Sequence, residues 1–285
     1  MEKKSTKFSY IWNSFKKNKA ALAGLIIICI FIFTAIFADL IVDYDVAIAQ
    51  NKYERLQGPS WEHFFGTDHL GRDVFARVVH GSRTSLSMGV VTTAISLFIG
   101  GILGIIAGYF GGWIDSIITR IMDMLMCIPS ILLSLCIITV LGTSTFNLLL
   151  AITISSVPGF TRILRATVIT MTSQEYIDAA KTAGSSHFKI MCSHILPNAV
   201  GMIIVQATMS ISGMIIFASG LSFIGLGVQP PVPEWGVMLS DAKKYMRYCP
   251  YLLIFPGMSI ALTALSLNLL GDGLRDVLDP HSKNN

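Results

Sequence analysis

The sequence predicts an all-α, polytopic membrane protein with six transmembrane helices. Of its 285 residues, 53% are hydrophobic and 13% are charged, and the mean hydropathy is +0.64. An ordinary soluble domain has about 25% charged residues, so this composition excludes that class. A helix needs about 20 mainly apolar residues to cross a bilayer. The sequence contains such runs at residues 20–40, 87–109, 121–141, 146–169, 200–223 and 251–270.

The positive charges predict the orientation of these helices. Six crossings place both termini on one side, and lysine and arginine next to a crossing resist translocation. The segments on the side of the termini carry more of them than the opposite segments, so both termini are expected in the cytoplasm. The net charge of +4 is therefore interpreted as a topology signal and not as nucleic-acid binding. The N-terminal tail, residues 1–19, carries Lys3, Lys4, Lys7, Lys16, Lys17 and Lys19.

The rest of the chain, residues 20–285, is predicted to be one transmembrane domain. Its external loop covers about residues 41–86, and a cytoplasmic loop covers about residues 170–198. The first apolar run is too long for a signal-peptide core of about 7–15 residues, so it is expected to remain as a helix. Five scattered cysteines, and His63 and His69 without a third donor, predict neither a disulfide framework nor a metal site.

Glycine and proline predict the packing of helices two to four. Gly104 and Gly108 lie one turn apart on the second helix, and such a face permits close helix contact. Pro129 in the third helix and Pro158 in the fourth remove backbone hydrogen bonds, so both helices are expected to bend there. Bends are typical of a translocation pathway, although they also occur in static bundles.

Charged residues near the ends of these helices have simple expected roles. Arg162 and Arg165 lie near the cytoplasmic end of the fourth helix, where their guanidinium groups are expected to reach water or lipid phosphate. Asp123 lies one turn from Arg120 on the third helix, and the two are expected to pair.

A polar segment, residues 175–198, separates the fourth and fifth apolar runs. Its first part contains good helix formers and the adjacent pair Ala179 and Ala180. Small side chains of this kind let another protein approach the backbone closely. The alternative interpretation is an ordinary amphipathic connector between two membrane helices.

The second part of this segment predicts a turn and another short helix. Gly184 is expected to end the first helix, and Ser185 or Ser186 to cap the second by accepting a hydrogen bond from an early backbone N–H. Pro197 is expected to end the second helix because it lacks a donor and clashes with the preceding turn. The predicted arrangement is helix, turn, helix.

This segment resembles the "EAA loop" of ATP-binding-cassette importer permeases. In that family the loop is cytoplasmic and sits in a groove of the ATPase subunit. The chain has Asp178 where the family more often has Glu, and His194 where it often has Ile. The resemblance implies an ATPase-docking loop that includes Asp178, Ala179, Ala180, Gly184, His194, Leu196 and Pro197.

The external segment carries a second motif. Gly66 and Gly71 suit tight turns, and Asp68 and Asp73 can pair with Arg72, Arg77 and Arg83 to order a polar cap. A structural clamp at the mouth of the second helix is favoured over direct substrate contact. The motif Gly66-Thr67-Asp68, followed by Gly71-Arg72-Asp73, is similar to a signature of the dipeptide, oligopeptide and nickel branch of these permeases.

Two later segments resemble the same branch. Residues 221–242 contain three closely spaced prolines and Trp235, which is expected at the outer membrane interface. The second segment, residues 255–280, belongs to the last predicted helix and includes its end. The resemblance therefore covers roughly residues 10–282, and it implies the transmembrane fold of type I importers and the second, C-type, permease subunit of a peptide importer.

The resemblance also implies the function and the partners. The sequence has no Gly-x-x-x-x-Gly-Lys-Ser/Thr motif and no motif of a protease or hydrolase, so the chain is expected not to be an enzyme. No cofactor is expected in this chain, and ATP and Mg are expected on partner subunits. The implied partners are a homologous second permease, two cytoplasmic ATPases, an extracytoplasmic binding protein, a peptide substrate and membrane lipid.

The implied mechanism is alternating access in the cytoplasmic membrane of a bacterium. Di- or oligopeptides are the expected substrates. Nickel or a metal chelate is the alternative within the same class, because this branch uses similar signatures for both. A membrane channel or scaffold without ATP coupling is the alternative from a different class.

Overall fold

The computed structural model describes residues 15–278, and helices dominate this range. Lys3, Lys4 and Lys7 of the predicted tail lie outside the described residues. The longest α-helices are α2 (Lys19–Ile36), α5 (Val74–Phe110), α6 (Gly112–Met126), α7 (Ser130–Leu141), α8 (Thr145–Thr172), α11 (Leu196–Phe223) and α13 (Tyr251–Leu278). Shorter α-helices are α3 (Ala38–Ile41), α4 (Tyr44–Ile48), α9 (Glu175–Thr182), α10 (His187–Ile190) and α12 (Trp235–Ala242).

Five helical segments within the described range are long and apolar enough to cross a membrane: α2, α5, α8, the segment from α10 through α11, and α13. The pair α6 and α7 provides a sixth span if the two are counted together, but their axes are bent by 82°. The structure therefore has the six predicted crossings only if the bent pair α6 and α7 is counted as one span.

The second and third predicted spans have different bounds in the structure. Helix α5 begins at Val74, well before the predicted start at residue 87, because the Asp73 carboxylate accepts a 2.8 Å hydrogen bond from the Ala76 N–H and caps the helix. Helix α6 begins at Gly112, before the predicted start at residue 121. Neither start was predicted, because the first turns of both helices contain polar residues or glycine and lack the apolar composition of a membrane span.

The two prolines behave differently. Pro129 lies between α6 and α7, where the span breaks, as the sequence predicts. Pro158 lies inside α8, which stays helical from Thr145 to Thr172, so this proline does not interrupt its helix. A proline removes one hydrogen bond wherever it occurs, but neighbouring helices can hold the chain in helical form.

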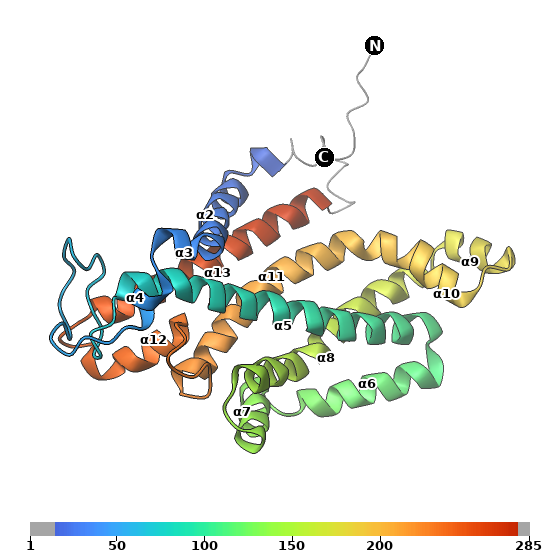
Figure 1. Cartoon of the computed structure of the whole chain (residues 1–285). Coiled ribbons are helices and arrows are strands. Elements are labelled where there is room, and N and C mark those ends of the chain that lie inside the picture. Colours follow the sequence, from blue (N-terminus) through green and yellow to red (C-terminus); the bar gives the residue numbers. More distant parts are fainter. Residues whose placement is uncertain (1–14, 279–285) are drawn as a thin grey trace, which may run out of the picture.

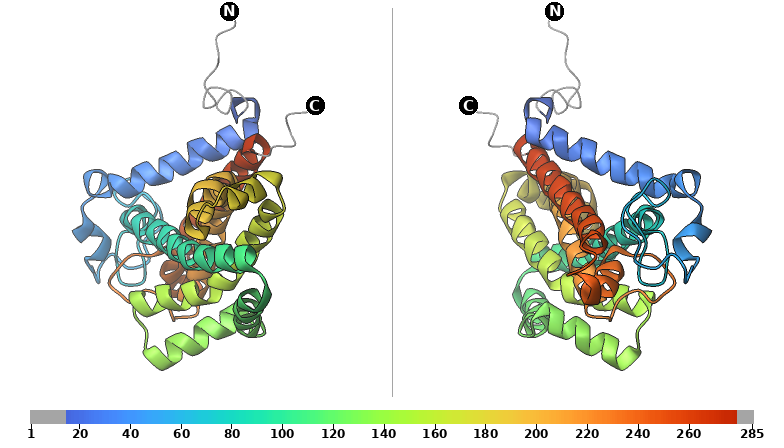
Figure 2. Two further views of the ribbon diagram at one scale, coloured as in Figure 1. Left: turned by 90° about the vertical axis from the view of Figure 1, so that its right-hand side faces the viewer. Right: turned by 90° about the vertical axis from the view of Figure 1, so that its left-hand side faces the viewer.

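The short helices lie at two opposite ends of the bundle. Figure 1 shows α9 and α10 at one end, and α3, α4 and α12 at the other. The broken pair α6 and α7 runs along one edge of the molecule, away from α2, in both views of Figure 2. The start of α2 lies near the end of α13, where the Asn18 Nδ2 donates to the Asp276 carboxylate over 3.3 Å.

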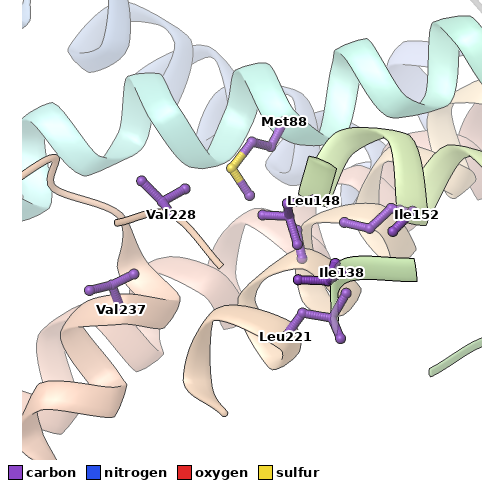
Figure 3. Packing of buried hydrophobic residues seen from close by; sticks show 9 residues of the cluster. Met88, Ile138, Leu148, Ile152, Leu221, Val228 and Val237 are labelled. Carbon is purple, nitrogen blue, oxygen red and sulfur yellow. The ribbon is translucent and has the colours of Figure 1, made fainter. Parts of the chain in front are cut away.

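A buried apolar cluster joins α5, α7, α8, α11 and α12. Figure 3 shows Met88, Leu148, Ile138 and Leu221 converging, with Val237 at the side of α12. Ile138, Leu148 and Leu221 are fully buried. The cluster packs α7, the second half of the broken span, against α8 and α11. These two helices adjoin the segment that contains α9 and α10.

Glycines of α5 allow a close helix contact, as predicted. Gly104 and Gly108 of α5 face α8 so closely that added Cβ atoms would lie 2.7 Å from the Thr161 carbonyl and 2.8 Å from the Arg165 carbonyl. Real Cβ atoms do not approach backbone oxygens at these distances, so only glycine permits this packing.

We expect Gly104→Leu to destabilise the protein by about 1–3 kcal/mol, the usual cost of overpacking a core. The side chain would displace α8, because it meets backbone rather than a mobile side-chain tip. Thermal unfolding of the purified protein in detergent measures the effect. Gly101→Leu is the matched control, since a Cβ at Gly101 meets no atom within 4 Å. Equal melting temperatures for the two variants would contradict the packing argument.

Candidate functional site

The predicted docking loop folds as two short helices joined at Gly184. Helix α9 ends with two hydrogen bonds of a Schellman motif: the Gly184 N–H donates to the Lys181 carbonyl over 2.9 Å, and the Ser185 N–H donates to the Ala180 carbonyl over 3.1 Å. Gly184 has φ +76°, a conformation that other residues adopt only at a cost. The predicted helix end at Gly184 is therefore confirmed.

The second half of the loop differs from the prediction. Ser186 caps α10, and its hydroxyl accepts from the Lys189 N–H over 3.3 Å, which agrees with the expected cap. Pro197 does not end this helix. A π-helical segment, Met191–Ile195, joins α10 to α11, and Pro197 lies in the first turn of α11. The helical backbone therefore continues through this proline from His187 to Phe223.

A small apolar core fixes the loop against the membrane helices. Ile177, Ile190 and Ile195 are fully buried, and they pack with Val168 of α8. The Tyr109 hydroxyl at the end of α5 lies 2.8 Å from Nδ1 of His187, which adds a polar contact. This core was not predicted from the sequence. The isoleucines indicate it, because each is an apolar residue in an otherwise polar segment.

The outward face of the loop carries most of the predicted docking residues. Asp178 and Ala179 are exposed, whereas Ala180 packs partly against the small apolar core. Gly184, Leu196 and Pro197 are exposed and His194 is half-buried. The structure thus leaves one of the two alanines exposed and packs the other against the core of the loop.

Phe188 adds an apolar contact point that the sequence analysis missed. Its side chain is 73% exposed at the tip of α10, although an exposed aromatic ring is unfavourable in water. Tyr176 of α9 is also exposed. These rings and Ala179 give the outward face of the loop, residues 175–190, a mixed polar and apolar surface suited to a protein partner.

Two ion pairs connect α8 to α6, outside the docking loop. Arg165 donates to both carboxylate oxygens of Asp115, over 2.5 and 2.6 Å, and Arg162 donates to Asp123 over 2.5 Å. The side chains of Arg162 and Arg165 are 50% and 32% exposed, so they reach solvent in part, as expected, but both also pair with α6. Asp123 pairs with Arg162 instead of the predicted Arg120. These partners lie 50 and 39 residues apart in the sequence, so the pairing depends on how α6 and α8 pack.

The external motif forms a buried charge network at the opposite end. Arg72 donates to Asp68 over 2.6 Å and to Asp241 over 3.0 Å, and Arg77 lies 3.7 Å from Asp68. Arg72 and Arg77 are each 2% exposed, so both charges depend on these carboxylates. Because Asp241 belongs to α12, the network joins the external loop to the segment before α13.

The remaining members of the motif hold the loop backbone. Gly66 and Gly71 have φ +76° and +77°, which confirms the predicted turns. The Thr67 hydroxyl bonds to the Glu54 carbonyl, and Asp73 caps α5 and accepts from His63 over 2.8 Å. All these residues make intramolecular contacts, in line with a structural clamp.

Two further residues of the external end are not where the sequence placed them. Arg83 does not join the network around Asp68, and instead pairs with Asp39 over 3.1 Å. Trp235 is fully buried rather than interfacial. Its Nε1 donates to the Val78 carbonyl over 3.0 Å, and its ring contacts Phe31 edge-on at a centroid distance of 5.6 Å.

Glu234 is a buried carboxylate that the sequence analysis missed. It caps α12, accepting 2.8 Å hydrogen bonds from the N–H groups of Gly236 and Val237, and it also accepts from the hydroxyls of Ser85 and Ser219. Burial raises the pKa of Glu234 above its usual 4.5, although the backbone N–H groups of Gly236 and Val237 oppose the shift. The carboxylate joins α5, α11 and α12.

We expect this raised pKa to make stability depend on pH. The folded state holds the proton more tightly than the unfolded chain, so the contribution of Glu234 is complete below its usual pKa and decreases as pH rises through the raised value. Thermal unfolding in detergent from pH 4.5 upward measures this decrease. Glu234→Gln should remove this part of the pH dependence. Parallel pH profiles for the two proteins would contradict the assignment.

A groove of about 270 Å³ opens where the third span breaks. Its walls are the end of α6, the start of α7, the middle of α8 and the middle of α11. Among the described residues, its lining is polar and uncharged or apolar. The polar members are Ser130, Ser155, Ser156, Gln206 and Ser210.

Comparisons with known proteins agree with these observations. Residues 100–284 match a family described as "binding-protein-dependent transport system inner membrane component", and residues 6–59 match the "N-terminal TM domain of oligopeptide transport permease C". A dipeptide transport system permease protein of Alkalihalophilus pseudofirmus is 50% identical over 268 residues, covering 94% of this chain and 88% of the relative.

Two further relatives have similar coverage. A di/tripeptide transport system permease protein of Pseudomonas aeruginosa is 42% identical, over 96% of this chain and 92% of the relative. A glutathione transport system permease protein of Pectobacterium atrosepticum is 41% identical, over 98% of this chain and 92% of the relative. The chain therefore belongs to the inner membrane components of binding-protein-dependent transport systems, and it is a multi-pass permease subunit of an ATP-binding-cassette importer.

Proposed function

We propose that this chain is the C-type permease subunit of an importer of di- or oligopeptides, with the loop at residues 175–198 as its ATPase-docking element. The observation that carries the proposal is the position of this loop. Its two ends continue into α8 and α11, which form two walls of the groove. A force applied to the loop therefore moves the walls of the groove directly.

The proposed mechanism is alternating access. Two cytoplasmic ATPases bind ATP and Mg, close on each other, and pull the loop of this chain toward the loop of a homologous second permease. The apolar core around Ile177 and Ile190 makes the loop rigid, so the displacement reaches α8 without being absorbed by local bending. No cofactor is assigned to this chain.

The proposed orientation places both termini and the docking loop in the cytoplasm, in the cytoplasmic membrane of a bacterium. The described residues of the opposite end, which include the charge network around Arg72, then face outward, where a binding protein delivers substrate. Residues 1–14 of the lysine-rich tail lie outside the described residues, so the support for this orientation is the sequence pattern and the separation of the two ends in Figure 1.

The names of the relatives support peptides as substrates, since they transport dipeptides, di/tripeptides or glutathione. Uptake of a labelled dipeptide, a longer peptide and nickel by cells with and without the gene tests this proposal. We expect loss of peptide uptake only. Loss of nickel uptake only would instead assign the chain to metal import.

The docking role has a separate test. Asp178 is exposed and pairs with Lys181 over 3.1 Å, so Asp178→Lys reverses a surface charge without disturbing the apolar core. We expect this variant to insert and assemble in the membrane but to transport more slowly, with weaker stimulation of the ATPases by loaded binding protein. Normal transport and normal stimulation would contradict the docking role.

A further inference from the structure

We propose that the groove at the break between α6 and α7 is the peptide-contacting part of the pathway, and that it binds N–H donors of the peptide main chain. This inference rests on the proposed function, because it names the chemistry by which the same permease would handle its substrate. The groove has about 270 Å³ of space and is open on one side. It could therefore hold part of an extended peptide.

The hydroxyl groups of α8 present acceptors to the groove. Ser155 donates to the Ala151 carbonyl over 2.8 Å, and Ser156 donates to the Ile152 carbonyl over 2.7 Å. A hydroxyl that donates to its own helix keeps lone pairs for a different partner. Both serines line the groove. The Ser155 hydroxyl also lies 2.8 Å from the Ser134 hydroxyl, so one of its lone pairs is used there. The other lone pair of Ser155 and those of Ser156 are available to a ligand in the groove.

Helix α11 supplies a further acceptor from the facing wall. The Gln206 Nε2 donates to the Ser210 hydroxyl over 3.1 Å, which leaves Oε1 of the same amide as an acceptor. Met214 lies one turn beyond Ser210 and adds a polarisable sulfur, 3.4 Å from the Ser156 hydroxyl. Two walls thus offer oxygen acceptors across a narrow space.

The same lining explains why side-chain identity would matter little. Within the described part of the chain, no lysine, arginine, aspartate or glutamate lines the groove. The nearby charged residues Arg162 and Asp123 are paired with each other instead. A wall of uncharged acceptors recognises main-chain N–H groups and the terminal ammonium group, which peptides share, and it imposes no charge requirement on their side chains.

Movement of the docking loop would open and close this groove. Gly159 and Ser156 lie on α8, which continues to Thr172 and then enters the docking loop, and Gln206 lies on α11, which follows that loop. The third wall, around Ser130, belongs to the broken span. Relative motion of the first two walls would therefore change the fit of a bound peptide during each ATP cycle.

The test uses the complete importer in proteoliposomes, with saturating binding protein and peptide, so that the maximal transport rate is measured. Gly159→Leu should fill the groove, because a Cβ at Gly159 meets no atom within 4 Å and the position lines the groove. Gly101→Leu is the matched control in a neighbouring spanning helix. We expect a loss of about tenfold for Gly159→Leu, equivalent to about 1.4 kcal/mol, and an unchanged rate for the control.

A second variant removes acceptors without filling space. Ser156→Ala combined with Gln206→Leu should lower the maximal rate several-fold, because each substitution removes one acceptor from the groove. The loss should be equal for acidic, basic and neutral dipeptides. A loss confined to one of these peptides would contradict main-chain recognition.

Two other outcomes would also overturn the inference. A normal rate for Gly159→Leu would show that substrate does not pass the groove. Loss of the assembled complex in this variant, measured by co-purification, would show that a partner helix packs there. If the unmutated importer transports no peptide, the proposed function fails, whereas an active importer with unaffected groove variants rejects only this inference.

Discussion

Gly184→Val is expected to uncouple ATP hydrolysis from transport. The residue has φ +76°, and an L-residue in the left-handed conformation costs about 1–2 kcal/mol, more for a β-branched side chain. A penalty of that size shifts the equilibrium between the native turn and other conformations of the loop by roughly tenfold against the native turn. The two helices of the docking loop would then lose their fixed angle, although a Cβ at this exposed site meets no atom within 4 Å.

The measurement is transport and ATPase activity of the complete importer, each with and without loaded binding protein. We expect transport to fall by up to about tenfold, the size of this shift in equilibrium, and the stimulation of the ATPases to fall with it. Gly142→Val is the matched control, because Gly142 also has a positive φ, at +88°, and open space around its Cβ, but ends α7 far from the docking loop in the chain. Equal losses for the two variants would attribute the effect to general strain.

Reversal of the ion pair between α6 and α8 should give the second large effect. Arg165→Asp would place two carboxylates together where Arg165 now makes two hydrogen bonds to Asp115. Their side chains are 32% and 18% exposed, so solvent screens the pair only partly, and the loss of such charged hydrogen bonds costs about 1.5–3 kcal/mol. We expect lower thermal stability and lower transport.

The exchange Asp115→Arg with Arg165→Asp should restore part of both properties. Restoration should be incomplete, because Thr119 also donates to Asp115 over 3.1 Å and cannot serve an arginine in the same way. The pair of Arg162 and Asp123 provides the comparison, since both side chains are 50% exposed and reversal of one charge should have a smaller effect. No rescue by the double exchange would show that the pair does not act as a unit.

Much of the architecture follows from the sequence, because apolar length decides which helices can cross a membrane. The glycine spacing around Gly104 predicts a close helix contact, for which the structure supplies α8 as the partner, and Gly184 predicts the turn of the docking loop. These features are local: a helix face or a single backbone conformation determines each of them.

Features that depend on contacts between distant segments could not be predicted in this way. The partner of Arg165 lies 50 residues away, on another helix, so the pairing depends on how α6 packs against α8. The buried position of Trp235 depends on Phe31 and Val78, from two other helices. Pro197 shows the same limit, because the chain continues as a helix through this proline by way of the π-helical segment before it.

Photo-crosslinking from the two ends of the molecule tests the central claim most directly. A photoreactive phenylalanine would replace Phe188, which is 73% exposed on the docking loop, or Trp61, which is 94% exposed at the opposite end. We predict that position 188 crosslinks to an ATPase subunit in the assembled importer and that position 61 does not. An ATPase crosslink from position 61, or none from position 188, would contradict the assignment of residues 175–198 as the docking element.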